Sequence, residues 1–278
     1  FVAFFIFTEH GVAKTISKGL IDPSVVTPTL LCAALLGAIV WNLLTWWLGL
    51  PSSSSHALLG GFAGAALAKA GPSAIILAGW VKPILGIVVS PFLGMTLGLL
   101  LSVTLSWSLW KQDARTLDRF FRRAQLVSAG LYSLAHGSND AQKTMGIIVG
   151  LLVASQSLFV GETGLLHGFY LPNADHVPLW VEMAAYSAIA AGTAMGGWRI
   201  VKTMGTGITK LQPFGGFCAE TGGAMTVFLA SSLGVPVSTT HTITGAIVGV
   251  GASRRLAAVR WGVAGRIVWA WVLTIPCS

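Results

Sequence analysis

Long apolar runs separated by short polar segments make up most of the chain, and several are long enough to cross a lipid bilayer. A membrane-spanning helix needs about 20 mainly apolar residues, and residues 25–50, 75–110 and 124–154 each reach or exceed that length. Pro83 and Pro91 lie inside the second run and predict a kink or a helix boundary there. The pattern predicts an all-α integral membrane protein, folded as a polytopic helical bundle.

Interruptions of these runs predict broken or re-entrant helices. Pro51 precedes four serines, after which residues 57–68 are typical of a short helix rich in small residues. A polar box at residues 136–143 lies within the third long run, which predicts a helix broken at Gly137 and resumed beyond it. Broken helices at membrane depth usually line a binding site, so we expect a site at these interruptions.

Charged residues are few and unevenly distributed. The 278 residues include 17 Lys and Arg and 9 Asp and Glu, and a charged fraction of 9% excludes an ordinary soluble domain. Twelve of the cations lie in three segments, residues 111–123, 199–210 and 254–266. This distribution argues against nucleic-acid binding. The positive-inside rule predicts that these segments are cytoplasmic and that residues 155–179, which contain no Lys or Arg, are external.

One segment recurs at an offset of 185 residues. Residues 49–64 and 234–249 share Gly, Pro, His and two further Gly at matching positions, and both carry Ser or Thr at three successive positions. Duplicated halves with corresponding interruptions are typical of secondary transporters, whose substrate site lies between the repeats. We therefore expect an internal, inverted repeat.

Three motifs resemble a known family. The box His136-Gly-Ser-Asn-Asp-Ala-Gln-Lys143 and the segments Phe217-Cys-Ala-Glu-Thr221 and Gly234-Val-Pro-Val-Ser-Thr-Thr-His241 resemble the second-half signatures of the inorganic phosphate transporter family, the cation-coupled phosphate permeases of the PiT type. Residues 51–56 resemble its first-half Pro-Ser-Ser-Ser-His element, and the similarity covers essentially the whole chain. The resemblance implies transport of inorganic phosphate across the plasma (inner) membrane, coupled to Na⁺ or H⁺.

The first-half Asn-Asp box of that family has no counterpart in this chain, and the repeat offset would place it before Phe1. Phe1 is not an initiator Met, and Ser278 directly follows an apolar run. We therefore expect a fragment, which would bind phosphate poorly or fail to transport it. Its expected parts are the remainder of an N-terminally truncated first repeat (1–110), a basic cytoplasmic loop (111–123) and a C-terminally truncated second repeat (124–278).

The two Pro–Ser/Thr elements supply groups that suit an oxyanion. A helix start offers free backbone N–H groups and the positive end of the helix dipole, and the hydroxyls add further donors without a buried positive charge. The alternative is that these hydroxyls only cap helices or pack small faces. The expected phosphate-binding residues are Ser53, Ser54, Ser55, Ser238, Thr239 and Thr240.

Acidic and amide side chains at membrane depth are candidates for cation coupling. Asn139 and Asp140 offer oxygen ligands for Na⁺ or a protonatable group for H⁺, although Asp140 could instead pair structurally with Lys143. Glu220 is a further candidate, with a structural role as its alternative. The expected site-orienting residues are His56, His241, Ser138, Gln142 and Lys143, with a phosphate contact as the alternative for the two histidines.

The sequence thus predicts a phosphate transporter and no enzyme, with phosphate, membrane lipid and a further copy of the chain as partners. A transporter of a related oxyanion such as sulfate, a passive channel and an intramembrane serine hydrolase are the alternatives, and the hydrolase is disfavoured because no Gly-x-Ser-x-Gly segment occurs. No organic cofactor is expected, and no metal beyond Na⁺ at Asn139 and Asp140. Cys32, Cys218 and Cys277 stand singly, which indicates neither a zinc site nor a disulfide.

Overall fold

A computed structural model describes residues 10–17 and 19–278 as an all-α protein. In this part of the chain the only strand-like pairing is an isolated bridge between Ile21 and Ile75. A π-helical turn at Thr203–Gly207 follows α8. The helices are α2 (Gly11–Ser17), α3 (Pro28–Leu48), α4 (Ser54–Ala70), α5 (Leu77–Ser108), α6 (Ala114–Ala154), α7 (Leu179–Ala194), α8 (Trp198–Lys202), α9 (Pro213–Ser232), α10 (Thr239–Arg254) and α11 (Trp261–Cys277).

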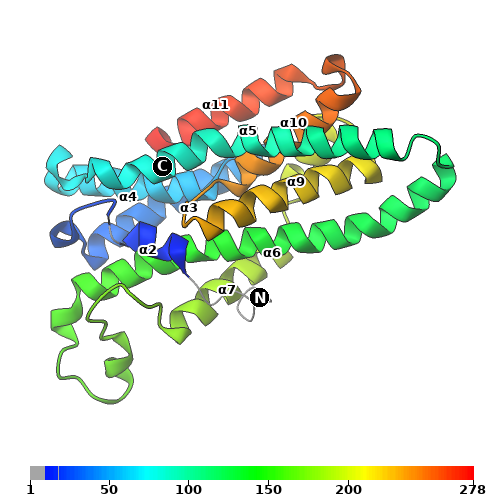
Figure 1. Cartoon of the computed structure of the whole chain (residues 1–278). Coiled ribbons are helices and arrows are strands. Elements are labelled where there is room, and N and C mark those ends of the chain that lie inside the picture. The colour runs from blue at the N-terminus through cyan, green and yellow to red at the C-terminus, as the bar shows by residue number, and fades with distance from the viewer. Residues whose placement is uncertain (1–9, 18) are drawn as a thin grey trace.

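Two long helices, α5 and α6, run antiparallel along the whole molecule (Figure 1). The predicted break at Gly137 is wrong, because α6 is one continuous helix of 41 residues that includes the polar box. The polar side chains there find partners on neighbouring elements, so the backbone has no need to unwind. The basic segment 111–123 is also mostly helical: Asp113 caps α6 by accepting a hydrogen bond from the Thr116 amide at 2.9 Å. Helix α5 likewise continues through Pro83 and Pro91.

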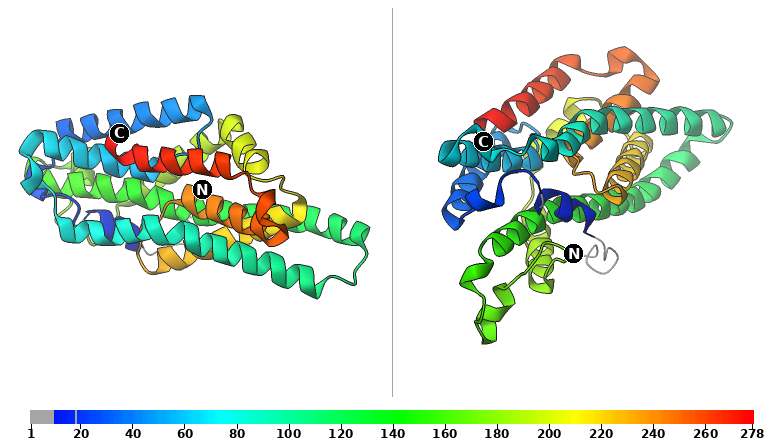
Figure 2. Two further views of the ribbon diagram at one scale, coloured as in Figure 1. Left: turned by 90° about the horizontal axis from the view of Figure 1, so that it is seen from above. Right: turned by 60° about the vertical axis from the view of Figure 1, so that its left-hand side comes forward.

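Two helical hairpins, α3–α4 and α9–α10, form the re-entrant elements. They enter from opposite ends of the molecule, and the connecting segments meet near its middle (Figures 1 and 2). Their boundaries follow the sequence repeat. Pro28 and Pro213 each lie in the first turn, and Ser53 and Ser238 each cap the second helix. The repeat is therefore inverted, because α4 and α10 run in opposite directions from the centre.

The second helix of each hairpin packs against a helix of the other repeat. Helix α10 lies on α5, where a Cβ atom at Gly245 would clash with the carbonyl oxygen of Pro91. Helix α4 lies on α11, and Gly60 approaches the backbone of Ile275 in the same way. Gly60 and Gly245 are the matching glycines of the sequence repeat. The two halves are consequently interlocked through close backbone contacts.

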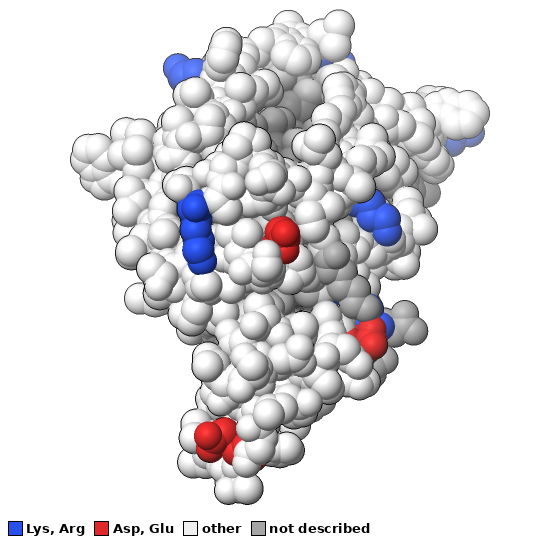
Figure 3. Space-filling view, turned by 90° about the vertical axis from the view of Figure 1, so that its left-hand side faces the viewer, with Lys and Arg blue, Asp and Glu red and all other residues white. Residues whose placement is uncertain are grey.

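The outer surface is largely apolar. Helices α3 and α5 are long and apolar enough to cross a membrane, with mean hydropathies of 1.8 and 2.3, and most of each lies on the surface. Exposed side chains on α3 include Leu36, Val40 and Trp47. This apolar side surface suits lipid contact, in keeping with an integral membrane protein. Figure 3 shows one end of the molecule, which carries scattered Lys, Arg, Asp and Glu side chains.

The three basic segments come together at one end of the molecule. The Arg260 amide donates a hydrogen bond to the Ile208 carbonyl oxygen at 2.9 Å, which joins the second and third segments. A cavity of about 360 Å³ is lined by residues of the first segment, among them Asp118, and by residues 212–214, which follow the second segment. The external loop predicted for 155–179 lies at the other end of α6 (Figure 1).

Candidate functional site

A cavity of about 810 Å³ opens between the start of α4, the middle of α6 and the region of α7 and α8. Most of its lining is small or apolar, including Ala185, Gly192 and Trp198. Its polar lining residues are Ser54, Ser55, His136, Asp140, Lys143, Thr144 and Thr193. A mainly apolar cavity with a few convergent polar groups is the usual form of a small-ligand site.

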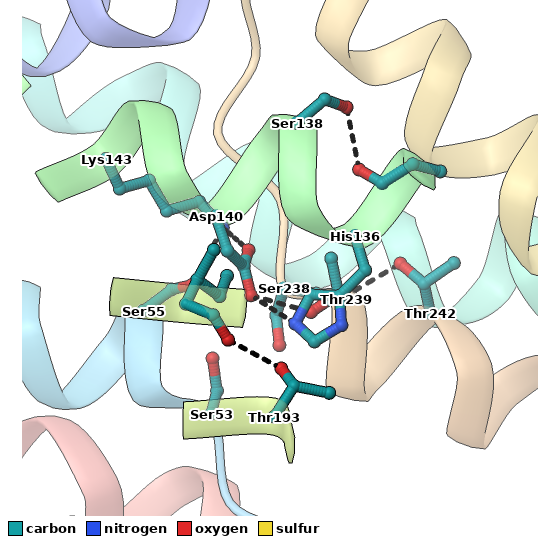
Figure 4. A network of polar contacts seen from close by, with 12 residues as sticks. Ser53, Ser55, His136, Ser138, Asp140, Lys143, Thr193, Ser238, Thr239 and Thr242 are labelled. Atoms are coloured by element: carbon teal, nitrogen blue, oxygen red, sulfur yellow. Dashed lines mark hydrogen bonds and ion pairs between the residues drawn. The ribbon is translucent and has the colours of Figure 1, made fainter. Parts of the chain in front are cut away.

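Asp140 is the centre of the polar cluster in this cavity (Figure 4). Its Oδ2 lies 2.9 Å from His136 Nε2 and accepts a hydrogen bond from Thr239 Oγ1 at 3.0 Å. Its Oδ1 forms an ion pair with Lys143 Nζ at 2.5 Å. Residues 136, 140 and 143 share one face of α6 because their spacings of three and four match the helix repeat. The carboxylate therefore joins α6 to the start of α10.

Lys143 joins the same cluster to both hairpins. Besides Asp140, its ammonium donates to Ser55 Oγ at 2.7 Å and to the Val237 carbonyl oxygen at 2.5 Å. Ser55 lies in the first turn of α4, and Val237 lies in the extended segment before α10. The pairing of Asp140 with Lys143, weighed in the sequence as the structural alternative, is present.

The two Ser/Thr elements differ in what they present. Ser53 and Ser238 accept hydrogen bonds from the His56 and His241 amides at 3.3 and 3.2 Å, so both hydroxyls cap their helices. In the first element, Ser54 and Ser55 line the cavity. In the second, Thr239 is bonded to Asp140, whereas Thr240 is half-buried and does not line the cavity. The start of α4 is therefore exposed to the cavity, whereas the start of α10 is not.

Other residues of the polar box face away from the cavity. Asn139 Nδ2 donates to Ser231 Oγ on α9 at 2.8 Å. Gln142 Oε1 accepts from the Val12 amide at 3.1 Å and so caps α2. Ser138 donates to the Ala135 carbonyl oxygen at 2.9 Å. The continuous helix places Asn139 and Asp140 about 100° apart around its axis, so the structure does not bring these two residues together.

Glu220 lies in a separate polar cluster. Its Oε2 is 2.5 Å from Ser128 Oγ, and its Oε1 accepts a hydrogen bond from Gln125 Nε2 at 3.4 Å. Ser128 precedes Asp140 by three turns of α6, which separates the two clusters by roughly 18 Å along the helix. The structure does not bring Glu220 to the cavity.

His56 and His241 meet where the two repeats come together. Their rings are 4.3 Å apart between centroids in an edge-to-face arrangement, and His241 stacks on Trp271 at 3.8 Å. Trp271 Nε1 also donates to the Pro51 carbonyl oxygen at 3.1 Å. Neither histidine lines the cavity, so their geometry favours the expected orienting role over a phosphate contact.

His136 and Thr193 line the cavity but were not among the expected site residues. His136 was detectable, since it precedes Asp140 by four residues and would share its face on an unbroken helix. The predicted break at Gly137 hid that relation. Thr193 stands alone in an apolar helix, and nothing in the sequence marks it.

Inverted helical hairpins that meet beside a cavity with a few convergent polar groups, within an apolar outer surface, define a membrane transporter. The sequence profile described as the Phosphate transporter family matches residues 1–278. The chain belongs to this family, which makes it a transporter and not an enzyme.

Individual proteins agree with this assignment. The chain is 55% identical over 278 residues to the "Probable low-affinity inorganic phosphate transporter" of Rhizobium meliloti (strain 1021), covering all of this chain and 79% of that protein. It is 43% identical over 273 residues to the protein of the same name from Bacillus subtilis (strain 168), covering 98% and 78%. A solved structure, "The sodium-dependent phosphate transporter", superposes with a TM-score of 0.81 at 26% identity, covering 99% of this chain and 83% of that one.

Proposed function

We propose that this protein carries inorganic phosphate across the bacterial plasma membrane together with a coupling cation, Na⁺ or H⁺. The observation that carries the proposal is the start of α4, which opens into the cavity beside a buried ammonium group. Ser54 and Ser55 line the cavity there, and Lys143 donates to Ser55 Oγ at 2.7 Å. Relatives named as inorganic phosphate transporters support the choice of substrate.

The start of α4 has the physical properties of an anion site. The first amide groups of a helix have no partner within it, and the helix dipole concentrates positive potential at this end. The positive charge of the Lys143 ammonium also attracts an anion, and the adjacent Asp140 carboxylate partly neutralises that charge. A balanced site holds an anion without trapping it, which a carrier requires because it must also release its substrate.

Phosphate fits this site better than sulfate. Hydrogen phosphate carries an O–H group that needs an acceptor, whereas sulfate needs only donors at neutral pH. The Asp140 carboxylate has about four acceptor positions, of which His136, Thr239 and Lys143 occupy three. One position therefore remains for the proton of bound phosphate.

Uptake of radiolabelled phosphate into proteoliposomes tests the proposal. For the complete protein we expect accumulation driven by an imposed Na⁺ or H⁺ gradient, with competition by unlabelled phosphate and little by sulfate. Asp140→Asn should lower uptake steeply. Asp118→Asn is the matched control, because Asp118 forms an exposed pair with Arg122 and such pairs contribute little. Uptake that persists unchanged after both gradients are collapsed would identify a passive channel instead.

A further inference from the structure

The ammonium group of Lys143 is enclosed by oxygen atoms. Its three N–H donors match three acceptors: Asp140 Oδ1 at 2.5 Å, the Val237 carbonyl oxygen at 2.5 Å and Ser55 Oγ at 2.7 Å. The side chain is only 4% exposed. A buried charge is stable when its donors are satisfied and an opposite charge lies beside it. These three contacts meet both conditions.

The three oxygens are of the kinds that a hard metal cation binds. They are a carboxylate, a hydroxyl and a main-chain carbonyl of a non-helical segment, and transporters use such unwound carbonyls to hold their ions. Ser55 belongs to the first hairpin, and Val237 belongs to the second. The ammonium therefore occupies a position between the repeats that would otherwise suit a small monovalent cation.

A Na⁺ ion does not fit beside Asp140 while this ammonium is in place. His136, Thr239 and Lys143 already contact the carboxylate, and a second cation a few ångströms from Nζ would be repelled strongly at this burial. Asn139, the other expected Na⁺ ligand, donates to Ser231 on a different face of α6. The residues thus disagree with a Na⁺ site formed by Asn139 and Asp140.

We propose that Lys143 is a built-in cation, whose ammonium permanently fills the cation position between the two hairpins and holds phosphate at the start of α4 without a Na⁺ ion at Asp140. The inference rests on the proposed phosphate transport. A tethered charge attracts the anion as a bound ion would, but it cannot be released on the other side of the membrane. The gradient that drives uptake therefore acts through another group.

Binding of ²²Na⁺ and of radiolabelled phosphate to the purified protein tests this inference. Lys143→Met removes the charge and keeps an unbranched side chain. In choline medium we expect the Kd for phosphate to rise about 30-fold or more, as when one partner of a buried charge pair is removed. Added Na⁺ should reverse most of this loss in the variant, which should also bind one more Na⁺ per chain than the unmodified protein. Lys82→Met is the matched control, since Lys82 is an exposed lysine of α5, and it should leave both quantities unchanged.

Two outcomes would overturn the inference. The first is a Lys143→Met protein that binds phosphate normally without Na⁺, or that gains no Na⁺ site. The second is obtained without altering Lys143: Na⁺ binding by the unmodified protein that Asp140→Asn abolishes would mean that Na⁺ already uses this carboxylate. This second measurement also decides the question if Lys143→Met fails to fold. A complete, unmodified protein that neither binds nor transports phosphate would refute the proposed function itself.

Discussion

Thr239 and Thr240 are adjacent hydroxyls with different surroundings. Thr239 donates to Asp140 Oδ2 at 3.0 Å, and its carbonyl oxygen accepts from the Tyr132 hydroxyl at 2.8 Å. The Thr240 hydroxyl makes no hydrogen bond with any residue that the structure describes. The first threonine therefore fixes the orientation of the carboxylate, and the second does not.

This difference predicts unequal effects of the same substitution. Thr239→Val keeps the shape of the side chain but removes a donor to a charged acceptor, so we expect phosphate binding to weaken by about 1–3 kcal/mol. Thr240→Val, the matched control, should have a much smaller effect. Measurement of Kd for both variants checks the prediction, and equal losses would show that both hydroxyls bind the substrate directly.

At this scale the sequence predicts the polar candidates and the local pair of Asp140 with Lys143, but not their partners on other helices. Asp140, Lys143, Ser55 and Thr239 were all named as candidates, because polar groups at membrane depth are costly and therefore conspicuous. The hydrogen bonds from Lys143 to Ser55 and from Thr239 to Asp140 join residues 88 and 99 positions apart. Such contacts depend on how helices pack, which local patterns do not encode.

At the scale of helices, the packing of α10 on α5 depends on the absence of a side chain at Gly245. A Cβ atom there would meet the Pro91 carbonyl oxygen, which is backbone and cannot rotate away. By contrast, Gly64 on α4 is exposed and has nothing within 4 Å of an added Cβ.

Gly245→Ala should therefore lower stability by about 1–3 kcal/mol, as expected for overpacking. Gly64→Ala should be neutral or slightly stabilising, because alanine favours a helix over glycine. Thermal unfolding of the two variants in detergent compares them directly. Equal melting temperatures would contradict the close packing of α10 on α5.

The sequence predicted most helices but misjudged α6. Its polar box interrupts a long apolar run, and this pattern predicts a break at Gly137. In the structure, Asn139 and Gln142 bond to α9 and α2, so the helix is surrounded by protein and needs no break. Periodicity identifies a helix, but burial decides whether it can carry polar residues.

At the scale of the whole molecule, the basic segments and the 155–179 loop lie at opposite ends of α6. The positive-inside rule then predicts a cytoplasmic Gln112 and an external Leu165, both exposed. Single cysteines at these positions, with Cys32, Cys218 and Cys277 replaced by Ala, report their side. A membrane-impermeant maleimide applied to intact cells should label Leu165→Cys and spare Gln112→Cys, and the reverse pattern would invert the topology.

The offset of 185 residues predicted the duplicated architecture, and both hairpins follow it. The packing of α4 and α10 on helices of the opposite repeat, an exchange of partners between the repeats, was not predictable in the same way. Gly60 and Gly245 appear in the sequence only as matching glycines, and nothing local states that each contacts a helix of the opposite repeat.

That exchange has a consequence for biosynthesis. Helix α4 is made before α11, the helix that covers Gly60, which follows roughly 200 residues later. At about 5–20 residues per second, translation leaves this surface uncovered for about 10–40 s. During that interval the nascent hairpin is exposed to premature association and degradation, so its survival depends on the insertion machinery or on neighbouring lipid.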